Sequence, residues 1–330
     1  MPAFSLVRSR KLPGCFKEQK TLDNKEAEPT RGVEPSITPE KLVHASIVNL
    51  INVRKCKRPN GEDWLLGMGS CSMVYKAKMG KLDVAVKTSR NDHNLLSEPH
   101  LPPQEALQAI SKELRMRQMV PFDNRIVQLY GSCSLDGNIF MVLEFMEGGD
   151  LRNAMKGHFA PALRWYNHGA GIALDIIKGI QFLHSRNIMH WDLRSSNVLL
   201  SKDCDSVKIC DVGLARMMSN SIMDSSHNVM TSFTYAAPEV VMCQRSDQRA
   251  DIFSYGVLLW ELITQETPQR GNLRDLQIPQ ECPQEISDMV AACTSQLASD
   301  RPTAQQIIRV MESSMINHQA GYNSQAQEDA

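Results

Sequence analysis

Two short polar clusters beside apolar strands constrain the fold of this chain more than any other feature. The first cluster is HWDLRSSN at residues 190–197, followed by the apolar run VLL, and the second is DVG at 211–213, preceded by VKIC. Carboxylate and amide oxygens ligate hard cations such as Mg²⁺, and a carboxylate beside a hydroxyl can accept its proton. Asp192, Asn197 and Asp211 supply these groups. The clusters therefore predict a metal-assisted polar site framed by buried strands.

A glycine-containing segment, LGMGSCSMV at residues 66–74, precedes both clusters. Glycine lets backbone N–H groups approach phosphate oxygens that a Cβ atom would keep away. On its own this pattern is weak, because an ordinary β-hairpin shows it too.

The apolar run VAVK ends at Lys87. Beneath a glycine-rich flap such a lysine can reach phosphate oxygens, provided that a carboxylate holds it in place. The helical pattern that follows offers Glu105 and Glu113. We prefer Glu113 for its spacing to the next strand, and the alternative is an ordinary surface glutamate.

The chain changes character after Gly148-Gly149, from β-type runs to helical patterns. A β-rich first third followed by a helical remainder predicts an α+β protein with two unlike lobes and a cleft between them. The segment KLVHASIVNLINV at residues 41–53 fits either a packing helix or a first strand.

The ordered motifs GxGxxS-V, VAVK, HWDLRSSN, DVG and APE (residues 237–239) resemble the signature set of the eukaryotic protein kinases. The resemblance implies a small antiparallel β-sheet lobe with one helix and a larger, mainly helical lobe. It places a kinase domain at residues 59–313, an N-terminal extension, largely linker, at 1–58 and a disordered tail at 314–330. It implies ATP and Mg²⁺ as cofactors and protein substrates as partners.

Residue roles follow from the same resemblance. Asp192 is expected to orient the acceptor hydroxyl and take its proton, with Arg194 beside it in the catalytic loop. Asn197 and Asp211 are expected to ligate Mg²⁺, and Lys87 with Glu113 resembles the phosphate-holding ion pair. The expected nucleotide-binding positions are Leu66, Gly67, Met68, Gly69, Ser70, Cys71, Ser72, Val74, Ala85, Lys87, Leu143, Glu144, Met146, Asp150 and Leu199. Among these, Leu143 resembles the gatekeeper, the stretch from Glu144 to Met146 the hinge, and Asp150 a ribose-binding acid.

Three positions depart from the family pattern. Ser72 replaces the third glycine, and Val212 replaces a phenylalanine and so removes an aromatic plug. Trp191 replaces an arginine that grips a phosphate on the activation segment, a contact that tryptophan cannot make. We therefore predict that phosphorylation of the activation segment does not switch this chain through position 191.

The acceptor class is read from two places. Arg194 stands where serine/threonine kinases usually carry lysine, yet Ser195-Ser196 resembles the tyrosine-kinase-like group. The segment at 231–239 is similar to T-x-x-Y-x-APE, a serine/threonine feature, and Thr234 is expected to face the acceptor loop. Transfer to Ser/Thr hydroxyls is therefore favoured. The alternatives are a tyrosine or dual-specificity kinase and a pseudokinase or scaffold that binds nucleotide without turnover.

Composition excludes several classes. The 36 Lys and Arg against 37 Asp and Glu leave a formal net charge of -1, which gives no sign of nucleic-acid binding. No apolar run approaches the roughly 18 residues of a spanning helix. Nine cysteines without a C-x-x-C pair favour a reducing, cytoplasmic setting. The basic first twenty residues are expected to be a disordered leader, with a transit peptide as the alternative.

Overall fold

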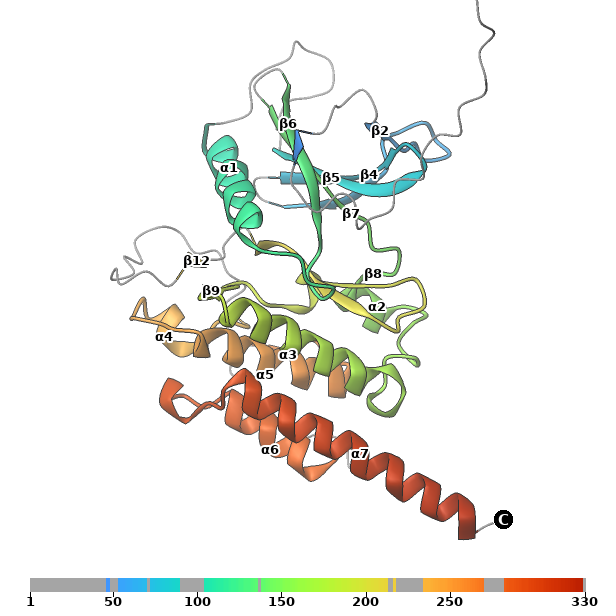
Figure 1. The fold of residues 1–330 in the computed structure, drawn as a ribbon, viewed down its shortest axis with the longest axis vertical. Coiled ribbons are helices and arrows are strands. Elements are labelled where there is room, and N and C mark those ends of the chain that lie inside the picture. The colour runs from blue at the N-terminus through green and yellow to red at the C-terminus, as the bar shows by residue number, and fades with distance from the viewer. Residues whose placement is uncertain are drawn as a thin grey trace, which may run out of the picture. The chain divides into compact units, whose positions relative to one another are not determined.

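The computed structural model describes residues 46–47, 53–69, 72–89, 104–135, 138–212, 216–217, 234–269 and 282–328. All of these elements belong to one compact unit, Pro39–Ala330. Within it, a β-sheet with one helix precedes a group of helices in the chain (Figure 1). The predicted α+β class with two unlike lobes is confirmed.

The first lobe is a seven-stranded sheet in the order β1-β6-β7-β5-β4-β2, with β3 paired to β4. Its strands are β1 (Ser46–Ile47), β2 (Val53–Lys55), β3 (Leu65–Met68), β4 (Ser72–Met79), β5 (Leu82–Ser89), β6 (Leu129–Leu135) and β7 (Asn138–Glu144). Helix α1 (Gln104–Met119) lies beside this sheet (Figure 1). Every pairing is antiparallel except that of β1 with β6.

Side-chain alternation along β5 builds a separate apolar cluster on each face of the sheet. Val84 and Val86 belong to one cluster, whereas Ala85 belongs to another that includes Ile110 of α1. Successive side chains of a strand point to opposite faces, so Lys87 is directed to the same face as Ala85. The sequence of β5 therefore aims its terminal lysine at helix α1.

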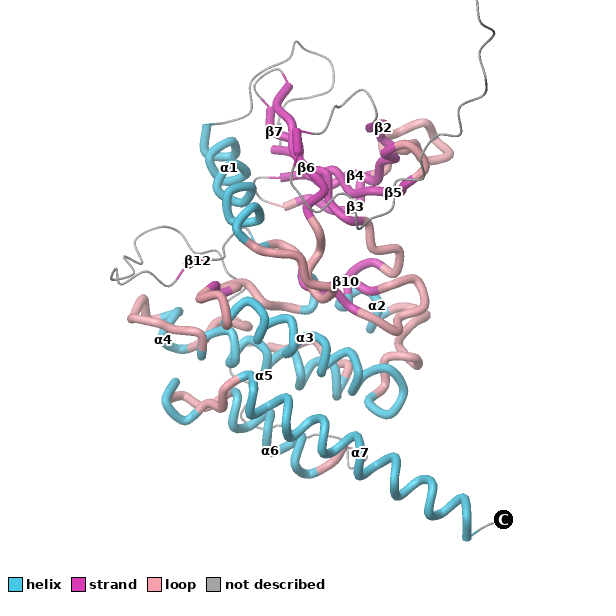
Figure 2. The backbone as a smooth tube through the Cα atoms, viewed as in Figure 1, coloured by secondary structure: helices cyan, strands magenta, loops and turns pink. Residues whose placement is uncertain are grey.

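The second lobe is mainly helical (Figure 2). Its α-helices are α2 (Leu151–Lys156), α3 (Ala170–His184), α4 (Pro238–Val241), α5 (Arg249–Thr264), α6 (Gln284–Cys293) and α7 (Ala304–Glu328). Its short strands are β8 (Gly149–Asp150), β9 (Ile188–Met189), β10 (Val198–Leu200), β11 (Val207–Ile209) and β12 (Arg216–Met217). Helix α5 is buried from Ala250 to Ile263 and forms the centre of this lobe. A helix buried on all sides must be apolar all round, apart from polar groups that find partners.

Gly148 and Gly149 mark the passage between the two lobes. A Cβ atom on Gly148 would lie 2.2 Å from the backbone oxygen of Ser201, closer than any real contact. Gly149 has a φ of +73°, a conformation that side chains disfavour. Gly148 is thus required by the close approach of this connection to Ser201, and Gly149 is required by its positive φ.

The structure differs from the sequence prediction at both ends of the domain. Residues 46–47 and 53–55 are strands of the sheet, within the extension at 1–58 that was predicted to be largely linker. For residues 41–53 the sequence left a packing helix or a first strand open, and the structure has strand β1 in this segment. Helix α7 continues to Glu328, where a disordered tail was predicted from residue 314. The polar composition of this segment suggested a tail. However, Ser314 is buried and Met315 packs on the core, so the helix continues beyond the expected end. In the described part of the chain no helix is both long and apolar enough to span a membrane.

Candidate active site

Lys87 lies between two carboxylates. Its Nζ atom is 2.7 Å from Oε2 of Glu113 and 2.7 Å from Oδ1 of Asp211. The side chains of Lys87 and Glu113 are 8% and 7% exposed, whereas that of Asp211 is 42% exposed. Burial alone would lower the pKa of Lys87, but the two carboxylates outweigh it and raise this pKa above its usual value. The structure thus brings Lys87 and Glu113 together as expected, while Glu105 is exposed.

Arg117 is a second cation at this site that the sequence analysis did not identify. Its Nε atom is 3.2 Å from Oε1 of Glu113, and its Nη1 atom donates to the backbone oxygen of Val127 at 3.3 Å. The side chain is 3% exposed. The only sequence signal was its spacing of four residues from Glu113, which places both on one helix face.

The catalytic-loop cluster is held together by its own side chains. Nδ2 of Asn197 donates to the backbone oxygen of Asp192 at 2.8 Å and to its Oδ2 at 3.0 Å. Nε of Arg194 donates to the hydroxyl of Ser196 at 2.6 Å. Burial raises the pKa of the Asp192 carboxyl, although its charged neighbours oppose the rise. Asp192 is thus oriented by Asn197 within a partly buried loop.

A buried aspartate of helix α5 holds the backbone of this loop by hydrogen bonds. Asp251 accepts the backbone N–H of His190 at 2.8 Å and that of Trp191 at 2.9 Å. Nε2 of His184 lies 2.8 Å from the same carboxylate. Burial would raise the pKa of Asp251, but these partners hold it below its usual value.

Asp211 is tied to the catalytic loop through the residue before it. The N–H of Cys210 donates to the backbone oxygen of Asn197 at 2.9 Å, and Nε2 of His190 lies 2.9 Å from the oxygen of Cys210. Burial would raise the pKa of Asp211, but Lys87 holds it at about 2. Asp211 is therefore an anion across the neutral pH range.

The donor set fits a hard divalent cation. Because both hydrogen bonds to Asp192 use the nitrogen of the Asn197 side chain, its amide oxygen can accept a further ligand. Asp211, two residues after the end of β11, adds a partly exposed carboxylate. One anionic and one neutral oxygen leave room for phosphate oxygens and water, which is the usual setting of Mg²⁺.

The glycine-rich hairpin joins β3 and β4. The N–H of Gly69 donates to the oxygen of Ser72 at 2.8 Å, which closes the turn between β3 and β4. A Cβ atom on Gly67 would meet nothing within 4 Å among the described residues, so the chain itself does not require glycine there. Ser70 and Cys71 lie outside the described residues.

Five of the expected nucleotide-binding residues lie in one apolar cluster. Ala85 and Leu143 face each other across β5 and β7 and are buried. Val74, Met146 and Leu199 pack against them. Leu66 and Met68 are exposed and do not belong to this cluster.

Two acidic positions have structural partners. The Glu144 carboxylate pairs with Nζ of Lys208 at 2.7 Å. Asp150 caps helix α2 by accepting the N–H of Asn153 at 2.9 Å. A hinge contact through the backbone near Glu144 and a ribose contact through Asp150 stay predictions.

Comparison with known proteins now identifies the family. Residues 62–311 match the family described as protein kinase domain. The chain belongs to the protein kinase family.

Curated relatives share this kinase domain but are longer proteins. A RasGEF domain-containing serine/threonine-protein kinase X from Dictyostelium discoideum is 34% identical over 71% of this chain and 23% of its own length. Human mitogen-activated protein kinase kinase kinase 11 is 30% identical over 75% of this chain and 30% of its own length. Serine/threonine-protein kinase STY17 from Arabidopsis thaliana is 30% identical over 74% of this chain and 42% of its own length. The chain thus spans less than half the length of each of these relatives.

Within the kinase domain, the segment before the APE motif is anchored to helix α5. The hydroxyl of Tyr235 donates to Oε2 of Glu261 at 2.5 Å, and Oγ of Ser195 donates to Oε1 at 3.0 Å. The motif's own glutamate, Glu239, forms a two-point contact with Arg301 at 2.7 and 2.8 Å. The catalytic loop and the end of the activation segment therefore share one buried support. Residues 231–233 lie outside the described residues, and Thr234 facing the acceptor loop stays a prediction.

Proposed function

We propose that this chain is a protein kinase that transfers the γ-phosphate of ATP to Ser/Thr hydroxyls of protein substrates. The observation that carries the proposal is the assembled charge arrangement of the site. Lys87 touches both Glu113 and Asp211, while Asn197 orients Asp192 on the adjoining loop. Phosphoryl transfer depends on such positioning and on electrostatic stabilisation more than on covalent chemistry.

Each group has a part in the proposed reaction. Lys87, held by Glu113, binds the α- and β-phosphates, and the apolar cluster around Ala85 receives the adenine. Asn197 and Asp211 would hold Mg²⁺, which supplies charge neutralisation at the phosphates when bound. Asp192 orients the acceptor hydroxyl and accepts its proton, helped by the burial that raises the pKa of its carboxyl.

A serine/threonine acceptor is supported by the sequence around the APE motif and by the relatives' names. Tyr235 of the T-x-x-Y-x-APE pattern is fixed by Glu261, next to the segment expected to hold the acceptor residue. The relatives from Dictyostelium discoideum and Arabidopsis thaliana are named serine/threonine-protein kinases. The pair Ser195-Ser196 supports placement in the tyrosine-kinase-like group.

A peptide-library phosphorylation assay with the full chain and Mg·ATP tests the proposal. We expect label on serine and threonine peptides. Label confined to tyrosine peptides would contradict the acceptor class, and no label at all would favour the nucleotide-binding scaffold. Six described cysteines, Cys56, Cys133, Cys204, Cys210, Cys282 and Cys293, form no disulfide, which supports a reducing compartment, and we infer the cytoplasm.

A further inference from the structure

The buried cation Arg117 balances the charges around Lys87. Lys87 and Arg117 face two carboxylates, Glu113 and Asp211, so the cluster has two positive and two negative groups. Glu113 is shared, with Oε2 on Lys87 and Oε1 on Arg117. A buried carboxylate that loses a cationic partner is strongly disfavoured. When Lys87 engages phosphate, Arg117 remains as the partner of Glu113.

Arg117 also connects helix α1 to the strand that delivers Asp211. Its guanidinium donates to the oxygen of Val127, and the N–H of Val127 donates to the oxygen of Ile209, the last residue of β11, at 2.9 Å. Asp211 follows two residues later. The carboxylate of Glu113 on α1 and the carboxylate of Asp211 are therefore placed relative to each other by one continuous set of hydrogen bonds.

The space for Arg117 depends on the small side chain of Val212. Both residues line the same narrow cavity of about 10 Å³, room for about one water molecule, beneath the end of α1. Val212 is fully buried. A phenyl ring in its place far exceeds the cavity and would have to displace the stem of Arg117 or its neighbours.

We propose that Arg117 and Val212 form a matched pair in which Arg117 is a positioning residue. It holds α1 and β11 in the arrangement that brings Glu113, Lys87 and Asp211 together, before nucleotide binds and without a phosphate on the activation segment. Arg117 has no part in the chemistry and acts through Glu113 and Val127. This inference rests on the proposed function only for its kinetic consequences.

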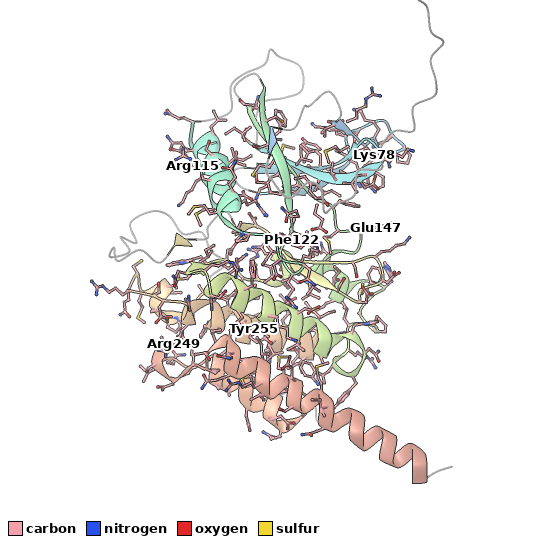
Figure 3. The ribbon with its side chains drawn as sticks, in the orientation of Figure 1. Lys78, Arg115, Phe122, Glu147, Arg249 and Tyr255 are labelled. Carbon is pink, nitrogen blue, oxygen red and sulfur yellow. The ribbon has the colours of Figure 1, made fainter. Side chains whose placement is uncertain are left out.

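The test compares Arg117→Met with Arg115→Met in the full chain. Arg115 lies on the same helix and is exposed (Figure 3), so it is a matched control. Hydrogen–deuterium exchange is measured for residues 104–119 and 207–211 without nucleotide, and kcat is measured at saturating Mg·ATP below the melting temperature of each variant. We expect exchange about tenfold faster in both segments and kcat about 10²-fold lower for Arg117→Met only. Arg117→Lys, which keeps the charge, recovers part of the loss in kcat.

Val212→Phe provides the second, independent arm. Alone it is expected to reproduce the faster exchange of Arg117→Met. The double variant is expected to be no worse than either single one, because both changes disturb the packing around the same cavity. Equal exchange and kcat for Arg117→Met and Arg115→Met would overturn the proposal, as would single effects that multiply in the double variant. If Arg117→Met does not fold, Arg117→Lys and Val212→Phe are compared with the control in the same way. A wild-type chain without transfer activity would refute the proposed function, while the exchange measurements would still decide the pairing.

Discussion

The backbone N–H of Trp191 donates to the carboxylate of Asp251 at 2.9 Å. Trp191 has a φ of 69°, a left-handed conformation that costs an L-residue roughly 1–2 kcal/mol. The contact is made by the main chain, so it does not depend on the side chain at position 191. The loop that carries Asp192 can therefore keep its shape although a tryptophan stands in place of the family's arginine.

Asp251→Asn is expected to lower the free energy of unfolding by about 3 kcal/mol, as removal of one partner in a buried ionic network does. The N–H groups of His190 and Trp191 donate to different oxygens of this carboxylate, so the NH2 group of an amide would face one of them and leave it without an acceptor. Urea denaturation measures the change. Asp288→Asn on the exposed face of α6 is the control and should stay within about 0.5 kcal/mol of wild type. Equal losses for the two variants would contradict the role of Asp251 as a buried support.

The stabilisation by Asp251 should also depend on pH in one direction. Its partners depress the pKa of the folded state below the usual 3.8, so the contribution is complete above that pH. It is lost as the pH falls through the depressed value. The stability difference between wild type and Asp251→Asn should therefore narrow below about pH 4. A difference that widens on acidification would show that the sign is wrong.

Glu113→Gln keeps the shape of the side chain but leaves Lys87 and Arg117 with one carboxylate fewer. We expect kcat/KM to fall about 10²-fold, comparable to the loss of one electrostatic contributor at an active site. Glu105→Gln, on the exposed first turn of the same helix, should leave kcat/KM unchanged within about twofold. Steady-state kinetics with varied ATP separates the two candidates. A larger effect at Glu105 would reverse the assignment of the ion pair.

Because Trp191 replaces the phosphate-binding arginine of the family, we predict that activity does not require a phosphate on the activation segment. The candidate hydroxyls lie outside the described residues and are Ser219, Ser221, Ser225, Ser226 and Thr231. Single alanine substitutions and phosphatase treatment should leave kcat within about twofold of wild type, because no arginine stands at position 191 to bind the phosphate. Phosphate-dependent activity at any one of these five positions would refute this prediction.

The residues to which we assign the chemistry could be proposed from the sequence because phosphate and metal dictate their types and spacing. Lys87, Asp192, Asn197 and Asp211 lie where the spaced motifs indicated, and the alternation along β5 accounts for the direction of Lys87. Arg117 was not identified, since a charged residue on a polar helix is usually solvated. Only the tertiary contacts with Glu113 and Val127 show that it is buried.

The fold class could be predicted from the change in sequence pattern at Gly148, but the first and last elements of the domain could not. Strand β1 is two residues long and pairs with residues 131–132 of β6. Because its partner is distant in the sequence, the local pattern of residues 41–53 could not decide between a helix and a strand. The end of α7 was predicted to be a disordered tail because its residues are mostly polar. Several of these residues favour a helix, and Met315, at the start of the segment, packs on the core.

Transfer of labelled γ-phosphate by wild type and by Asp192→Ala tests the central claim most directly. The two proteins are compared at equal nucleotide occupancy, with Asp203→Ala on an exposed turn as the control. We expect nucleotide affinity to be retained and transfer by Asp192→Ala to fall by about 10²- to 10⁴-fold, the usual contribution of a general base. Asp203→Ala should match wild type. Equal label from wild type and Asp192→Ala would contradict the proposal that this chain is an active kinase.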